Sequence, residues 1–244
     1  MCGRFTLTAG DREWLAQELG VPIEEIDAER YRPRYNIAPT DPHWLLRLQR
    51  EDRELRPARW GLVNAGAPDR RRAAAQINAR AESAAHARAY RDAFARRRCA
   101  VPADGFFEWT GSAKARRPYW FHRPDGGLLL FAGLYEQWTP PPALEARANE
   151  AGATAPQPET TFTIVTTDAN STVGAIHGRM PVVLSEEAVD DWLFEGERDH
   201  ERLSALLRPA PDDLLIATAV SSRVNSVRHD DPACLEPAAE QLSF

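Results

Sequence analysis

Residues 118–138, PYWFHRPDGGLLLFAGLYEQW, contain two runs of aromatic and aliphatic residues separated by the turn-forming sequence PDGG (124–127). This pattern predicts two strands joined as a β-hairpin. Apolar runs of strand length recur along the chain on both sides of this stretch. They predict further strands at residues 43–50, 54–62, 99–109 (with a turn at Asp104-Gly105), 161–169 and 214–221.

Three segments carry helical signals. Residues 11–20, DREWLAQELG, form a short amphipathic pattern that Asp11 can cap and Gly20 can end. Residues 79–98, ARAESAAHARAYRDAFARRR, are rich in Ala and Arg and give the strongest helix signal in the chain. In residues 185–194, SEEAVDDWLF, Ser185 precedes acidic residues and predicts a capped helix. Many strands with segregated helices favour the α+β class.

The composition indicates an ordinary globular protein. The length of 244 residues suits one large domain, and 43% hydrophobic and 27% charged residues are typical of soluble chains. We expect no signal peptide, and no apolar run approaches the roughly 18 residues of a membrane span. Residues 139–160 are rich in Pro and Ala and poor in β-branched and aromatic residues, which predicts a mobile surface insertion.

The cysteines and histidines give no sign of a metal site. Cys2, Cys99 and Cys234 are odd in number and far apart, which argues against a disulfide framework and favours a reducing cytoplasm. The sequence has no Cys-x-x-Cys pair and no cluster of histidines. We therefore expect neither a metal nor a cofactor.

Charge is distributed unevenly along the chain. The formal net charge is −6, but residues 67–98 hold nine arginines against Asp69, Glu82 and Asp92. A local basic segment is an electrostatic footprint for nucleic acid. A solvated basic helix face explains the same charges, and the sequence leaves both interpretations open.

The stretch MCGRF at the N-terminus raises a chemical possibility. Removal of Met1, which commonly precedes a small second residue, would give Cys2 a free α-amine beside its thiol. The amine has an ordinary pKa of about 7.7–8.0, so part of it is nucleophilic at neutral pH. An aldehyde would condense with the amine, and the thiol could then close a thiazolidine ring intramolecularly.

Three further polar residues stand in unusual company. Asn78 lies in INARAES (77–83), Glu108 lies among aromatic residues in GFFEWT (105–110), and His177 lies in AIHGRMP (175–181). Burial among apolar residues would raise the pKa of Glu108 toward the range of a general acid. Each also has an ordinary explanation, since Asn78 can cap a helix, Glu108 can face solvent and His177 can decorate a loop.

Taken together, seven motifs occur in a fixed order. They are MCGRF, YNIAPT, RWGLV, INARAES, GFFEW, IHGRMPVVL and VNSVRHDDPACLEP. This series resembles the SRAP family, the SOS-response-associated peptidases, from residue 2 to about residue 237 apart from the insertion at 139–160. The resemblance implies one α+β domain over residues 2–237, with a tail at 238–244. It also implies a mixed, largely antiparallel, barrel-like sheet with peripheral helices.

The resemblance also implies a function. Family members recognise abasic sites in single-stranded DNA and bind them covalently through the N-terminal cysteine. Cys2 would be the nucleophile, and Asn78 would hold the N-terminal residue and the opened sugar. Glu108 would transfer protons to and from the amine and sugar. His177 would assist ring opening and imine formation.

The resemblance extends to the DNA contacts and to the protein's surroundings. It implies phosphate contacts at Arg4, Arg80, Arg88 and Arg179, and Asn36 and Pro39 in the same DNA-facing cleft. The expected partner is single-stranded DNA containing abasic sites, bound by a monomer in the bacterial cytoplasm, near the nucleoid. Autopeptidase activity and cleavage of the abasic strand are further activities that the resemblance implies.

Two departures from the family pattern stand out. Residues 64–76, NAGAPDRRRAAAQ, lack the aromatic loop expected after RWGLV, and Arg70–Arg72 are the residues that could replace it electrostatically. Gly178 stands between His177 and Arg179, where an aspartate is common. Two other classes compete with the SRAP interpretation. They are an N-terminal-nucleophile amidohydrolase or amidotransferase using Cys2, and a passive single-stranded DNA-binding module.

Overall fold

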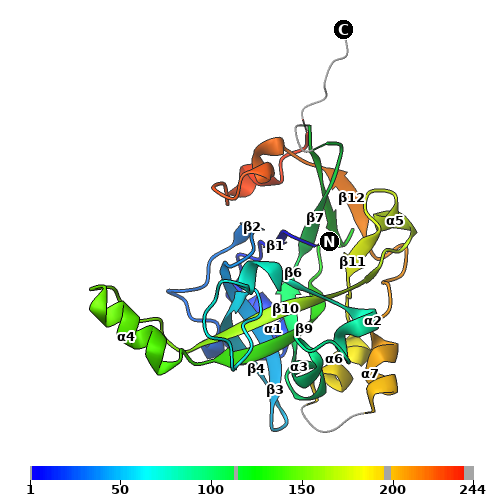
Figure 1. The fold of residues 1–244 in the computed structure, drawn as a ribbon. Coiled ribbons are helices and arrows are strands. Elements are labelled where there is room, and N and C mark those ends of the chain that lie inside the picture. The colour runs from blue at the N-terminus through cyan, green and yellow to red at the C-terminus, as the bar shows by residue number, and fades with distance from the viewer. Residues whose placement is uncertain (1, 113–114, 195–198, 239–244) are drawn as a thin grey trace.

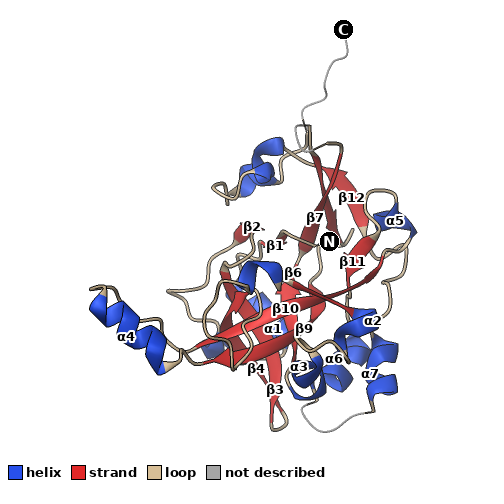
Figure 2. Ribbon diagram, viewed as in Figure 1, coloured by secondary structure: helices blue, strands red, loops and turns tan. Residues whose placement is uncertain are grey.

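The structure is a computed structural model that describes residues 2–112, 115–194 and 199–238. Strands lie at the centre and helices at the periphery (Figure 2). The strands are β1 (Phe5–Leu7), β2 (Arg34–Ile37), β3 (Pro42–Gln49), β4 (Asp52–Trp60), β5 (Asn78–Arg80), β6 (Arg98–Ala103), β7 (Gly105–Thr110), β8 (Arg117–His122), β9 (Leu129–Trp138), β10 (Glu159–Asp168), β11 (Arg179–Pro181) and β12 (Ile216–Ala219). The helices are α1 (Arg12–Leu19), α2 (Ala81–Ala84), α3 (Arg91–Arg96), α4 (Pro142–Glu150), α5 (Ser171–Gly174), α6 (Glu186–Leu193) and α7 (His200–Leu206).

Five strands close into a barrel. β3 pairs with β4 and β6, β6 pairs with β9, and β9 pairs with β10, all antiparallel. A parallel pairing of β10 with β4 completes the ring. The short strands β5 and β11 extend the barrel on opposite sides of β10, since both pair with it at Thr166. Closure leaves the barrel strands with few unpaired edges.

A second sheet packs on this barrel. Its order is β12-β8-β7-β1-β2, and its strands are antiparallel. Phe5 and Phe106 of this sheet meet Phe131 of the barrel edge-on, with ring centroids 6.2 and 6.0 Å apart. The two sheets therefore share one aromatic core, and the predicted α+β class is confirmed.

Helix α1 has the predicted boundaries. The Asp11 carboxylate accepts hydrogen bonds from the backbone N–H groups of Glu13 and Trp14, and Gly20 follows the helix with φ 66°. This left-handed conformation suits glycine. Helix α6 also begins after Ser185 as predicted, although the Ser185 hydroxyl makes no capping hydrogen bond.

The predicted hairpin over residues 118–138 is wrong. Both strands exist, but β8 pairs with β7 and β12, whereas β9 pairs with β6 and β10. The PDGG sequence thus carries the chain from one sheet to the other. The actual hairpin is β7–β8, because Phe106 and Phe121 stack in the shared core and fix that pairing.

The continuous helix predicted over residues 79–98 is also wrong. The segment begins in β5, forms the short helices α2 and α3, and ends in β6. Tertiary contacts override the helical propensity of the segment. β10 recruits β5 by parallel pairing, and Arg98 is only 1% exposed. Its guanidinium donates to the carbonyl groups of Phe94, Ala95 and Trp192 at 2.9, 2.6 and 2.8 Å.

The segment 139–160 has more secondary structure than its composition predicts. It contains α4, which projects from one side of the body, and its last two residues begin β10 (Figure 1). Its mobility and the domain limits stay predictions. Met1 and residues 239–244 of the predicted tail lie outside the described residues. Within the described ranges, no helix combines the length and apolar character needed to cross a bilayer.

Candidate active site

Cys2 lies at the start of the second sheet, fully buried. Its backbone carbonyl accepts a hydrogen bond of 2.8 Å from the Asn78 side-chain amide, and its Sγ lies 3.8 Å from the carbonyl oxygen of Arg4. Burial is the main reason that the pKa of the Cys2 thiol is raised, and the nearby Glu108 carboxylate adds to the effect. The resting thiol is therefore protonated.

Glu108 faces the interior and not the solvent. β7 pairs directly with β1, which brings Glu108 beside the N-terminal segment. Its side chain is 5% exposed, and burial raises the pKa of its carboxyl above the ordinary value, whereas the charge of His177 opposes this. A buried carboxyl with a raised pKa can hold a proton to donate.

His177 reaches the same place from the loop before β11. Its Nδ1 lies 3.7 Å from Glu108 Oε1, and 34% of its side chain is exposed. The Arg179 backbone N–H donates to Nδ1 at 3.0 Å, and the Arg179 carbonyl oxygen lies 3.2 Å from the same nitrogen. Nδ1 thus has a neighbouring donor for its neutral state and acceptors for its protonated state. This pairing suits a residue that both accepts and donates a proton.

These side chains meet at the seam between the barrel and the second sheet. Cys2 and Glu108 belong to the second sheet, whereas Asn78 and His177 belong to segments on the two sides of β10. Asn78 is the first residue of β5, and the hydroxyl of Tyr90 donates to its carbonyl oxygen at 3.1 Å. The structure therefore brings together all four residues that the sequence singles out for catalysis.

Arg4 and Asn36 join the N-terminal strand to a C-terminal strap, which we define as residues 222–234. Arg4 Nη1 donates to Asn36 Oδ1 at 2.8 Å and to the Val224 carbonyl oxygen at 2.9 Å. The Asn36 amide donates to the carbonyl oxygens of Val224, Ser226 and His229. Asn36 is 1% exposed. Its side chain is an interior anchor, so the expectation that it faces DNA is not supported.

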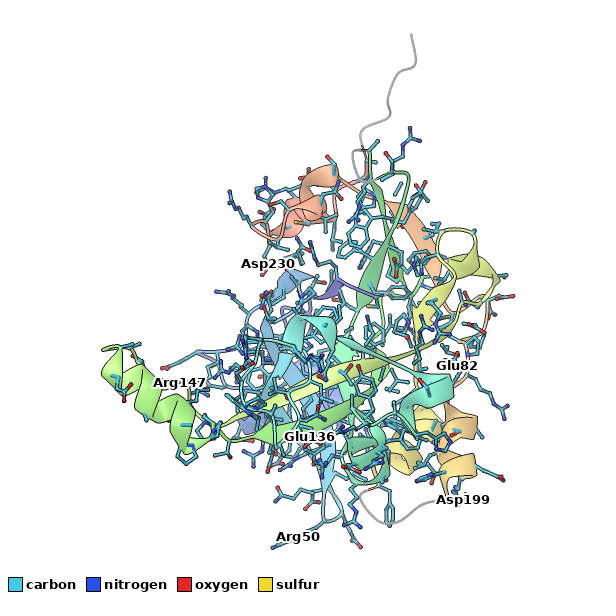
Figure 3. The ribbon with its side chains drawn as sticks, viewed as in Figure 1. Arg50, Glu82, Glu136, Arg147, Asp199 and Asp230 are labelled. Carbon is cyan, nitrogen blue, oxygen red and sulfur yellow. The ribbon has the colours of Figure 1, made fainter. Side chains whose placement is uncertain are left out.

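Asp230 is a residue of this region that the sequence analysis did not single out. Its carboxylate accepts hydrogen bonds from the backbone N–H groups of Tyr35 and Asn36 at 2.6 and 2.9 Å, and it pairs with Arg34. It therefore fixes the strap to β2; Figure 3 labels it on the strap. The available signal was the acidic pair in VNSVRHDDPACLEP.

The other residues expected to contact DNA fall into two groups. Arg80 and Arg88 are exposed, and Pro39 is partly exposed. Arg179 is different, because its guanidinium pairs with Glu82 and Asp168 at 2.5 and 2.7 Å, and only 17% of its side chain is exposed.

A groove of about 1030 Å³ opens beside this seam. The loop after β4 forms one wall, and the segment after α2 forms the other. Gln76 and Ala89 line the groove, and each is close in the chain to Asn78 or Tyr90, which bond to one another. The charged lining residues are Asp69, Arg71, Arg72, Arg88, Arg91, Asp92, Arg97 and Glu136.

Three of the groove arginines are neutralised within the protein. Arg71 pairs with Asp69, Arg91 with Asp92, and Arg97 with Glu136, at 2.6, 3.4 and 2.6 Å. Arg72 and Arg88 are exposed and, in the part of the chain that the structure describes, form no ion pair. The groove therefore carries an excess of two positive charges.

The loop that forms this wall is held from behind. The indole N–H of Trp138 donates to the Ala67 carbonyl oxygen at 2.8 Å, and the Arg70 guanidinium lies over the Trp138 ring while pairing with Glu159. Gly61 has φ 112°, and a Cβ there would lie 2.6 Å from the carbonyl oxygen of Ala73. The glycine of RWGLV is thus required by the path of the loop.

Among the described residues, no group of three or more His, Cys, Asp and Glu side chains could hold a metal ion. Fold and site together define an α+β protein with a cysteine-centred polar site at the seam of a β-barrel, next to an arginine-lined groove. The chain belongs to the SOS response associated peptidase (SRAP) family, whose pattern it matches over residues 1–227.

Named relatives and a solved structure agree with this assignment. The chain is 34% identical to the abasic site processing protein YoqW of Bacillus subtilis over 97% of its own length and 99% of that protein. It is 31% identical to the abasic site processing protein HMCES of Gallus gallus, covering 97% and 78% of the two chains. A crystal structure of a Bacteroides thetaiotaomicron protein superposes with a TM-score of 0.81 at 22% identity, over 98% of this chain and 100% of that one, and supports the fold.

Proposed function

We propose that this protein captures abasic sites in single-stranded DNA by forming a covalent bond through Cys2 after Met1 has been removed. The names of the relatives, abasic site processing protein, support this lesion as the substrate. The observation that carries the proposal is the meeting of Asn78, Glu108 and His177 around Cys2 from three separate segments.

The proposed reaction consumes one aldehyde and releases one water. The Cys2 amine nitrogen adds to the aldehyde carbon of the opened deoxyribose, and loss of water from this adduct leaves an imine. Sγ then adds to the imine carbon while the thiol proton passes to nitrogen, which closes a five-membered thiazolidine ring. No electrons are exchanged with any other reagent, and the ring closure is intramolecular.

Three side chains support these steps. Asn78 holds the Cys2 carbonyl and so fixes the direction in which the amine and thiol project. The buried Glu108 carboxyl, with its raised pKa, is placed to donate the proton that leaves with water. His177 is partly exposed and can accept or donate a proton at the sugar as its ring opens.

The groove supplies a path for the DNA strand. Arg72, Arg80 and Arg88 are exposed and free of ion pairs within the described ranges, so their charges are available to phosphates. The groove lining contains no aromatic residue on which a base could stack. We therefore expect the flanking strand to be held through its backbone, with little sequence preference.

Denaturing electrophoresis tests the proposal. The wild-type protein, incubated with an oligonucleotide carrying one abasic site, should give an adduct that survives denaturant without a reducing agent. Cys2→Ala should give none. Cys2→Ser keeps the amine but not the thiol, so its adduct should need borohydride reduction to survive. An equally stable adduct in Cys2→Ala would rule out the proposed nucleophile.

The same gel addresses two activities that stay predictions. Cleavage of the abasic strand would appear as a shortened oligonucleotide. Autopeptidase activity on Met1 would be lost in Cys2→Ala and would require no DNA.

A further inference from the structure

The Arg179 guanidinium is fully occupied at its outer nitrogens. Nη1 donates to Glu82 Oε1 at 2.5 Å and to Asp168 Oδ1 at 2.7 Å. Nη2 donates to Glu82 Oε2 at 3.0 Å and to the Thr166 carbonyl oxygen at 2.7 Å. These bonds use all four N–H groups of the two nitrogens. A DNA phosphate could reach them only by replacing a bond that already exists.

This contact crosses β10. Thr166 pairs with Arg80 of β5 on one side and with Pro181 of β11 on the other. Arg179 begins β11, whereas Glu82 lies in α2, two residues after β5 ends. Glu82, labelled in Figure 3, lies on the side of the molecule where β11 and α5 are found in Figure 1. The bidentate pair therefore joins the segments on the two sides of the strand.

Each of those segments carries a residue of the site. Asn78, which holds Cys2, lies four residues before Glu82. His177 lies two residues before Arg179, and its ring nitrogen Nδ1 accepts the backbone N–H of Arg179. A shift of Arg179 would therefore turn the His177 ring away from Glu108. A displacement of about 1 Å at a reacting group can cost on the order of a hundredfold in rate.

We propose that Glu82 is a positioning residue, which acts through Arg179 to fix His177 against Asn78 and Glu108. The inference rests on the proposed function. Asp168 contacts the same guanidinium but has a different role. It lies on β10 beside Arg179 and does not bridge the strand, and its side chain is 81% exposed. An exposed ion pair of this kind contributes little.

Glu82→Gln and Asp168→Asn form a matched pair for the test, because each removes one negative charge from the same guanidinium. The single-turnover rate of adduct formation and the Kd for undamaged single-stranded DNA are measured for both. We expect Glu82→Gln to lower the rate about tenfold, a change of the size that misplaced supporting residues cause. Asp168→Asn should lower it less than twofold. Neither variant should weaken DNA binding, since a removed acid favours phosphate.

A double-mutant cycle separates positioning from a general structural defect. In a His177→Ala background, Glu82→Gln should have no further effect on the rate. An equal loss in both backgrounds, a wild-type rate in Glu82→Gln, or a parallel loss of DNA affinity would each overturn the inference. If the wild-type protein forms no adduct, the proposed function fails first, so the two failures are distinguishable.

Discussion

At the scale of single residues, the state of Cys2 sets the order of the chemistry. Its thiol is buried and its pKa is raised, so the thiolate is scarce in the resting protein. The amine is then the first group to attack the aldehyde, and the thiol reacts only once an imine lies next to it. Glu108 fits this order, because a buried carboxyl can give up its proton as water leaves.

Glu108→Gln should slow adduct formation by about a hundredfold or more, the usual contribution of a general acid. It should also stabilise the protein at pH 8. The folded state holds the Glu108 proton more tightly than the unfolded state, so ionisation at higher pH destabilises the fold. We expect a gain on the order of 1 kcal/mol, typical of relieved active-site strain.

Urea denaturation at a series of pH values checks the stability part of this prediction. The difference between Glu108→Gln and wild type should vanish below about pH 4.3, where the carboxyl is protonated in both states. It should grow as the pH rises. A variant that is less stable than wild type at pH 8 would contradict the assigned pKa direction.

At the scale of elements, local sequence patterns identified most strands and helices but not how they connect. The caps of α1 act within one turn, so the sequence showed both its ends. The 118–138 hairpin failed because the PDGG signal reports a turn and cannot report which sheet the next strand joins. The 79–98 helix failed because β10 and the buried Arg98 act from distant parts of the chain.

The site shows the same limit. Motifs identified Asn78, Glu108 and His177, but nothing local revealed that Arg179 is held by Glu82 and Asp168. The interior position of Asn36 was equally hidden, since its partners lie about 190 residues further along the chain.

The groove loop leads to a prediction at this scale. Arg72→Ala and Arg88→Ala should each weaken binding to undamaged single-stranded DNA. Each should also reduce the slope of log K against log salt concentration by about 0.7, the value for one lost phosphate contact. Arg123→Ala serves as the control, because Arg123 pairs with Asp125 in the turn between β8 and β9, outside the groove. Fluorescence anisotropy titrations from low to high salt provide the measurement. An unchanged slope in both groove variants would exclude this DNA path.

At the scale of the whole molecule, the core that joins the two sheets contains one titratable group. His43 is 5% exposed, packs edge-on against Phe5 and contacts the Pro102 carbonyl oxygen at 2.8 Å. Burial lowers the pKa of His43 to about 3. The folded protein therefore keeps this ring neutral under conditions in which the unfolded chain binds a proton.

His43 should make the fold acid-sensitive. As the pH falls below about 6.5, the unfolded state takes up a proton that the folded state does not. The free energy of unfolding should then fall by about 1.4 kcal/mol per pH unit from this residue. Chemical denaturation between pH 7 and pH 4 should show a shallower fall in His43→Gln than in wild type. His86→Gln, at an exposed position, should parallel wild type. Parallel curves for all three proteins would contradict the assignment.

The most direct test of the central claim is the intact mass of the protein before and after reaction with an abasic oligonucleotide. The adduct should weigh as much as the chain without Met1 plus the oligonucleotide, less one water. Protease digestion should leave the DNA on the peptide that begins with Cys2. An adduct that retains Met1, or DNA attached to any other peptide, would contradict the claim that the amine and thiol of Cys2 together capture the lesion.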